Sequence, residues 1–205
     1  MPLKLYISQA NQAHNAGPKG YTEKAGMDAI SRRLAKLLVK DGRFTVKRNT
    51  AGARIDTASE NTREANAWGA DYYVALHSNA GMRGTIVFHH STSPRGKALA
   101  KAIFNQIAKL SPGAETGTRI RAWDGLIEIH GPKAPAVLVE LEAHDWAGGV
   151  AWLTGKREAI ALALYRGVCK GVGLKPKTFD PIVTVRVRRS VWNAFKAWRA
   201  KRAAA

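Results

Sequence analysis

Two short runs of consecutive apolar residues constrain the fold of this chain more than any other feature. YVAL at 73–76 and AVLV at 136–139 lack the alternation of polar and apolar residues that a strand with one solvent-facing side would show. Such runs are typical of strands in a parallel sheet that helices cover on both faces. Helix-like segments separate these runs from other strand-like segments, and this alternation predicts an α/β fold.

The remaining segments extend this pattern to a single domain with a mostly parallel, twisted sheet of about six strands and helices on both faces. The strands are expected at 3–8, 43–48, 72–77, 84–90, 125–130 and 134–142. The helices are expected at 23–42, 56–69, 93–110 and within 150–173. Thr22 is suited to cap the first helix and Gly42 to end it. Asp56 or Thr57 is the expected cap of the second, and Gly69 its expected end.

A shift in composition near residue 174 divides the chain. The formal charge is +18, and residues 174–205 hold nine of the 33 Lys and Arg but only one of the 15 Asp and Glu. We therefore expect a domain at 1–173 and a short basic C-terminal extension at 174–205. Phe195 and Trp198 lie on one side of a helix-like segment that begins at Ser190. This extension is suited to an anionic cell-wall polymer, to a membrane surface, or to packing on the domain, and we favour packing.

The chain carries no sign of export or membrane insertion. The N-terminal residues lack a long apolar run, and no segment reaches the length of a membrane span. The single cysteine, Cys169, allows no intrachain disulfide. We expect synthesis in the cytoplasm without a signal peptide, and a monomer. The basic charge implies an anionic partner, but it is spread over the chain and defines no docking stripe for a specific nucleic acid.

Several acidic and imidazole side chains lie where strands end or where the next helix begins: His14, Glu23, His77 and Glu140. In a doubly wound sheet these positions converge at the carboxyl edge of the strands. Two imidazoles and one carboxylate, here His14, His77 and Glu23, are a suitable set for a catalytic zinc ion, which leaves a fourth position for water. Glu140 would then be free to act as a general base, and desolvation at the strand end would raise its pKa.

Ordinary structural roles remain open for the same residues. Glu23 is suited to stabilise the start of a helix, and Glu140 to form a salt bridge. Glu142 lies on the same face as Glu140 by strand alternation and is its rival. The further candidates for substrate binding near the same edge are Asn79, His130, Glu142 and His144.

Four motifs in this order resemble a known family. They are TEKAG at 22–26, YVALHSNA at 73–80, GTIVFHHSTSPRGKALAKAI at 84–103 and PAVLVELEAHDW at 135–146. Together they resemble the zinc-dependent N-acetylmuramoyl-L-alanine amidases of the amidase-3 type, particularly those of phage endolysins, over roughly residues 3–173. One departure is SQANQAHNAG at 8–17, where many relatives have a DPGHGG-like segment.

The resemblance implies an enzyme that cleaves the amide bond between N-acetylmuramic acid and L-alanine in peptidoglycan. It also implies one Zn²⁺ per chain, held by His14, Glu23 and His77, with Glu140 as the catalytic glutamate. We therefore expect a phage or prophage endolysin that is made in the host cytoplasm and acts on the cell wall after release. The alternatives are a basic nucleic-acid-binding protein and a membrane-active protein, neither with hydrolase activity.

Overall fold

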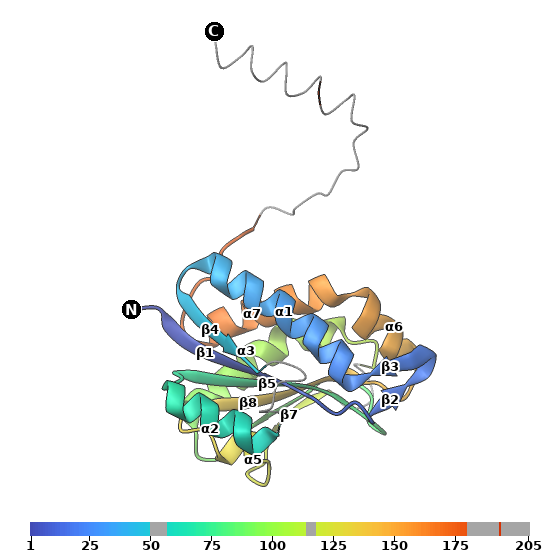
Figure 1. The fold of residues 1–205 in the computed structure, drawn as a ribbon, viewed down its shortest axis with the longest axis horizontal. Helices are drawn as coiled ribbons and strands as arrows, with labels where there is room; N and C mark the ends of the chain where they lie inside the picture. The colour runs from blue at the N-terminus through green and yellow to red at the C-terminus, as the bar shows by residue number, and fades with distance from the viewer. Residues whose placement is uncertain (50–56, 114–117, 180–192, 194–205) are drawn as a thin grey trace.

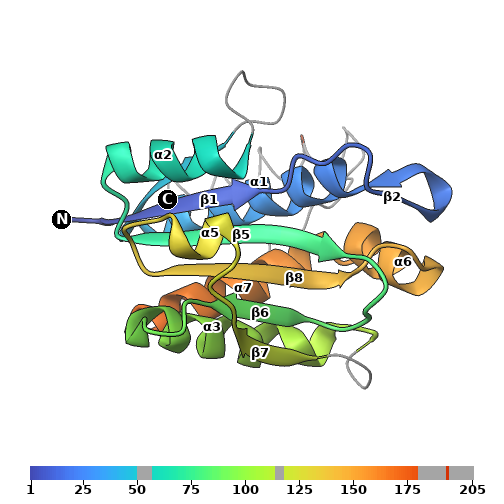
Figure 2. The same cartoon turned by 90° about the horizontal axis from the view of Figure 1, so that it is seen from below.

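A six-stranded sheet between two layers of helices forms the domain in the computed structural model, which describes residues 1–49, 57–113, 118–179 and 193 (Figure 1). The strand order is β4-β1-β5-β8-β6-β7. All neighbouring strands are parallel except β6 and β8, which run antiparallel (Figure 2). The strands are β1 (Leu3–Gln9), β4 (Phe44–Arg48), β5 (Tyr72–Asn79), β6 (Ile86–His89), β7 (Arg119–Ala122) and β8 (Ala136–Ala143). The predicted α/β fold is confirmed.

The helices divide between the two faces of the sheet (Figure 1). One face carries α1 (Glu23–Asp41), α3 (Pro94–Ile107), α6 (Ala147–Gly155) and α7 (Arg157–Gly171). The other carries α2 (Ala58–Trp68) and the single turn α5 (Ile127–His130). A small hairpin of β2 (Ala16–Gly17) and β3 (Tyr21–Thr22) encloses the 3-10 turn η1 (Pro18–Gly20), and a second such turn, η2 (Ala108–Leu110), follows α3.

The caps of α1 and the N-terminal cap of α2 form as the sequence predicts. The Thr22 hydroxyl accepts a hydrogen bond from Ala25 N at the start of α1, and Gly42 ends that helix in the left-handed conformation with φ of 79°. Thr57 forms a capping box at the start of α2. The alternative cap, Asp56, lies outside the described residues.

The central strands are buried on both faces. Val74 and Leu76 of β5 pack in the core beneath α1, α3 and α7, whereas Tyr73 and Ala75 pack in a second core beneath α2 and α5. His77 continues this alternation and therefore lies on the face that α2 and α5 cover.

The prediction of a strand at residues 125–130 is wrong. Residues 127–130 instead form the helical turn α5, in which the neighbours Glu128 and Ile129 are both buried. A strand would place them on opposite faces. The sixth strand is instead β7. Its segment has no apolar pattern because β7 is a largely exposed strand at the sheet edge and contains two arginines.

The division at residue 173 stays a prediction. The described start of the extension contacts the domain, since Lys177 Nζ donates to Asp41 O at 2.6 Å and the ring centroids of Phe179 and Tyr165 lie 5.1 Å apart. The helix expected at 190–205 lies outside the described residues, apart from position 193. Within the described ranges, no helix combines the length and hydropathy needed to cross a membrane.

Candidate active site

His77 bridges two buried carboxylates near the carboxyl end of β5. Its Nδ1 lies 3.1 Å from Glu23 Oε1, and its Nε2 lies 2.8 Å from Glu128 Oε2. The His77 side chain is 14% exposed. Burial opposes a charge on this ring, but the hydrogen bonds to Glu128 and Glu23 outweigh it and hold the pKa of His77 well above its ordinary value. Without a metal ion, the imidazole is therefore a cation that donates to both carboxylates.

Glu23 is held in place by α1, by β5 and by the loop after β1. It is the first residue of α1 and is 1% exposed. Its Oε1 also accepts from Ser78 N at 3.0 Å, and its Oε2 accepts from Asn15 Nδ2 at 2.6 Å. Burial would raise the pKa of Glu23, but the contacts with His77, Asn15 and Ser78 outweigh burial and lower it. The carboxylate is thus charged and its orientation is fixed.

Glu128 is the functional candidate that the sequence analysis missed. It lies on α5 and is 4% exposed. Its Oε1 accepts hydrogen bonds from Ser8 Oγ and, at 2.8 Å, from Tyr73 Oη. Burial opposes ionisation, but His77, Ser8 and Tyr73 together lower the pKa of Glu128. The only signal in the sequence is an acid within the apolar segment LIEI.

Glu140 lies beside His77, its partner in the parallel register of β5 and β8. Among the described residues, Glu140 Oε2 is a buried oxygen with no hydrogen-bond partner. Burial raises the pKa of Glu140 to about 7; the charge of His77 opposes this shift, and the charges of Glu23 and Glu128 add to it. Such a carboxyl group can take up or release a proton near neutral pH.

His14 lies in the exposed loop after β1. It lines a cavity of about 240 Å³ together with His77 and Glu128. In the part of the chain that the structure describes, no three His, Cys, Asp or Glu side chains are grouped as a metal site. The structure thus brings Glu23 and His77 together, and ligation by His14 stays a prediction.

All four predicted substrate-binding residues have hydrogen-bond partners in the structure. His144 is buried, with its Nδ1 3.0 Å from Ser78 Oγ, and so supports the residue next to His77. His130 lies on α5, where its exposed ring has Nδ1 3.0 Å from Asp124 O. Asn79 ends β5, and its Oδ1 accepts from Ala80 N at 2.8 Å. Substrate contact by these residues stays a prediction.

Glu142, the alternative to Glu140 as the general base in the sequence analysis, has a different environment. The register of β5 and β8 shifts beyond His77, so that Asn79 pairs with Ala143. Glu142 is fully buried and accepts hydrogen bonds from Gly84 N at 2.7 Å and Gly113 N at 2.9 Å. These contacts indicate that Glu142 holds two loops together. Its predicted contact with substrate is untested.

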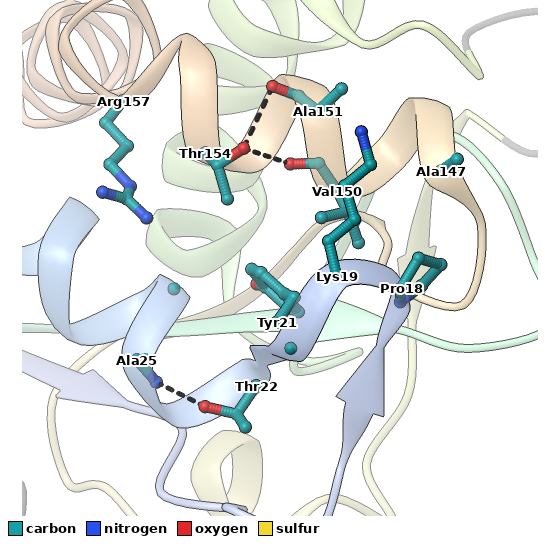
Figure 3. Close-up of a pocket in the computed structure, with 12 residues that line it drawn as sticks. Pro18, Lys19, Tyr21, Thr22, Ala25, Ala147, Val150, Ala151, Thr154 and Arg157 are labelled. Carbon is teal, nitrogen blue, oxygen red and sulfur yellow. Dashed lines mark hydrogen bonds between the residues drawn. The ribbon is translucent and has the colours of Figure 1, made fainter.

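A larger cavity of about 510 Å³ lies between the β2–β3 hairpin and α6, with Lys19, Thr154 and Arg157 among its lining residues (Figure 3). Tyr21 also lines it, and the Tyr21 hydroxyl contacts Ser78 Oγ at 3.2 Å. None of the predicted zinc ligands or catalytic residues lines this cavity. His14 and His77 line the smaller cavity, whereas Glu23 and Glu140 are not among its lining residues, so the candidate active site is His77 with its buried neighbours beside that cavity.

Comparisons with known proteins bear on the family and the fold of this chain. Residues 8–170 match the amidase-3 family, described as N-acetylmuramoyl-L-alanine amidase. The chain's fold resembles that of the amidase AmiC2 of Nostoc punctiforme, with a TM-score of 0.72 and 20% identity, over 83% of this chain and 97% of that one. An N-acetylmuramoyl-L-alanine amidase from Clostridium difficile 630 gives a TM-score of 0.73 and 16% identity, over 83% and 97%.

The catalytic domain of the CD27L endolysin targeting Clostridia difficile gives a TM-score of 0.66 and 19% identity, over 86% of this chain and 99% of that one. No protein in a search of curated sequences matches the chain. The identities to solved structures are low and establish a shared fold. The family match covers well over half of the sequence and confirms the resemblance seen in its motifs. The chain belongs to the N-acetylmuramoyl-L-alanine amidase family.

Proposed function

We propose that this protein is a zinc-dependent N-acetylmuramoyl-L-alanine amidase that hydrolyses the bond between N-acetylmuramic acid and L-alanine in peptidoglycan. The observation that carries this proposal is the arrangement of Glu23, His77 and Glu140 at the carboxyl edge of the sheet in a member of this family. An ionised carboxylate, an imidazole and a carboxyl group with a pKa of about 7 are suited to hydrolysis of an amide.

The donor atoms of Glu23 and His77 fit two ligands of a zinc ion. Glu23 Oε1 and His77 Nδ1 lie 3.1 Å apart. Two ligands of one tetrahedral zinc ion lie about 3.3 Å apart, given zinc–ligand bonds of about 2.0–2.1 Å. We propose His14 as the third ligand, since it lines the same cavity as His77. When bound, zinc supplies Lewis-acid polarisation of the scissile carbonyl and lowers the pKa of the attacking water.

Glu140 moves the protons in this reaction. Its unpartnered Oε2 is available to accept a proton from water, and the resulting carboxylic acid can donate that proton to the leaving amine of L-alanine. In the protein without a metal ion, the pKa of about 7 lets Glu140 exchange a proton near neutral pH. Glu23 stays ionised throughout, because Asn15 and the Ser78 amide hold its charge.

Digestion of purified peptidoglycan, with products identified by mass spectrometry, tests this proposal. We expect stem peptides with a free L-alanine amine, lost with EDTA, regained with zinc, and lost in Glu140→Ala. Glu64→Gln is the matched control, because the partners of Glu64 are Lys47 Nζ at 3.0 Å and Tyr6 Oη at 2.5 Å, whereas the ring nitrogens of His77 contact Glu23 and Glu128. Intact peptidoglycan under all conditions would refute the proposal, and products cut within the stem peptide would indicate a peptidase.

We also propose that the protein is a phage or prophage endolysin that reaches the wall after release from the host cytoplasm. The fold shared with the catalytic domain of the CD27L endolysin supports this role. Expression in bacteria with and without a separate pore-forming protein tests it. Lysis only with the pore-forming protein is the expected result, and lysis without it would refute dependence on release.

A further inference from the structure

We propose that Glu128 is a positioning residue that holds His77 with Nδ1 directed at Glu23 and so prepares this ring as a zinc ligand. The proposal rests on the proposed zinc-dependent function. It adds a residue to which neither the family motifs nor the sequence analysis gives a role.

The two ring nitrogens of His77 face different carboxylates. Nδ1 lies 3.1 Å from Glu23 Oε1, and Nε2 lies 2.8 Å from Glu128 Oε2. An ion bound between Glu23 and Nδ1 leaves the Nε2–H to donate to Glu128. Histidine ligands of metal ions almost always donate their other N–H in this way, which fixes the tautomer and the ring orientation and makes the ligating nitrogen more basic.

The surroundings of Glu128 fix its position before any ion binds. Ser8 Oγ of β1 and Tyr73 Oη of β5 both donate to its Oε1. Asn61 Nδ2 of α2 in turn donates to Ser8 Oγ at 3.2 Å. Tyr73 lies four residues before His77 on the same strand and therefore on the same face. The carboxylate that orients His77 is thus anchored to two strands and a helix, which are more rigid than loops.

The distances argue against Glu128 as a direct zinc ligand. The alternative site would use His77 Nε2, Glu128 and His14, which share one cavity. However, 2.8 Å between Nε2 and Glu128 Oε2 is a hydrogen-bond length, shorter than the roughly 3.3 Å between two ligands of one tetrahedral ion. The other oxygen of Glu128 already accepts two hydroxyl hydrogen bonds. The 3.1 Å between Nδ1 and Glu23 Oε1 is also a hydrogen-bond length in the metal-free protein, but it lies closer to the separation of two ligands.

NMR of the unaltered protein labelled with ¹⁵N-histidine gives the first test and requires no variant. His77 is assigned by comparison with His77→Asn. On addition of zinc, we expect the Nδ1 resonance of His77 to move to the range of a metal-bound nitrogen while Nε2 keeps its proton. The reverse result, with zinc at Nε2 and a proton on Nδ1, would overturn the proposal.

Zinc affinity, measured by competition with a chromophoric chelator, gives the second test. Loss of the carboxylate that orients a ligating histidine typically weakens metal binding 10- to 100-fold. We expect a loss of this size in Glu128→Ala, a smaller loss in Glu128→Gln, and a fall in kcat with little change in KM in Glu128→Gln.

Asp41→Asn is the matched control. It removes another buried carboxylate, at the far end of α1, about 27 Å from Glu23 at 1.5 Å per helical residue. We expect Asp41→Asn to lose stability but to keep its zinc affinity. Unchanged zinc affinity in Glu128→Ala would overturn this inference alone. Absence of zinc binding in the unaltered protein would instead refute the proposed function.

Discussion

Replacing Glu140 by glutamine should stabilise the metal-free protein at alkaline pH, although it removes the proposed catalytic group. Burial raises the pKa of Glu140 from 4.5 to about 7, and its Oε2 has no hydrogen-bond partner among the described residues. The folded protein therefore keeps this proton to a higher pH than the unfolded chain does. The contribution to stability is fully present below pH 4.5 and is lost as the pH rises through about 7.

The size of this effect follows from the pKa shift. Each pKa unit corresponds to about 1.4 kcal/mol, so the complete shift would give roughly 3 kcal/mol. Glu140 keeps some exposure to solvent, which reduces the effect. We expect Glu140→Gln to match the unaltered protein at pH 5, apart from a constant offset. At pH 8, the free energy of unfolding of Glu140→Gln should exceed that of the unaltered protein by about 1–3 kcal/mol more than it does at pH 5.

Urea unfolding in the presence of EDTA, followed by tryptophan fluorescence at pH 5 and pH 8, measures this difference. Asp41→Asn is the control. It should lower the free energy of unfolding, and by the same amount at both pH values, whereas Glu140→Gln should raise it at pH 8. A difference between Glu140→Gln and the unaltered protein that is the same at pH 5 and pH 8 would refute the reasoning. The reasoning would also be refuted if Glu140→Gln became less stable relative to the unaltered protein from pH 5 to pH 8.

Three further predictions concern the scaffold. A hydrogen bond from Arg43 lowers the pKa of Asp41 from 3.8 to about 2, so Asp41→Asn should cost about 2 kcal/mol at pH 7. This difference should be present above pH 3.8 and should vanish as the pH falls through about 2, as acid titration of both proteins by circular dichroism will show. Thr57→Ala removes the capping box of α2 and should cost about 1 kcal/mol in urea unfolding, whereas Thr57→Ser should cost less. Gly84→Ala should lower the melting temperature, because Gly84 has φ of +93° and a Cβ there would lie 2.6 Å from Thr118 Oγ1; an unchanged melting temperature would contradict the described backbone.

The sequence alone determined the fold class and the edge of the sheet at which the candidate residues His77 and Glu140 meet. Burial on both faces leaves a direct mark on a strand as a run of apolar residues, and β5 and β8 show it. Parallel strands bring their carboxyl ends to one edge, so the positions of His77 and Glu140 could be predicted to meet before any contact was known. The start of α1 could be predicted because its N-terminal cap, Thr22, is a signal within the local sequence.

Only the tertiary structure decided which side chains surround His77. Glu128 reaches the ring from α5, a single turn whose LIEI sequence alternates like a strand and becomes helical in the packed domain. A shift in register after His77 gives Glu142 different neighbours from those of Glu140. No pattern in the sequence of β8 predicts this shift. Contacts between residues far apart in the sequence depend on how the elements pack and on the register of the strands. The local periodicity of a sequence contains no information on either.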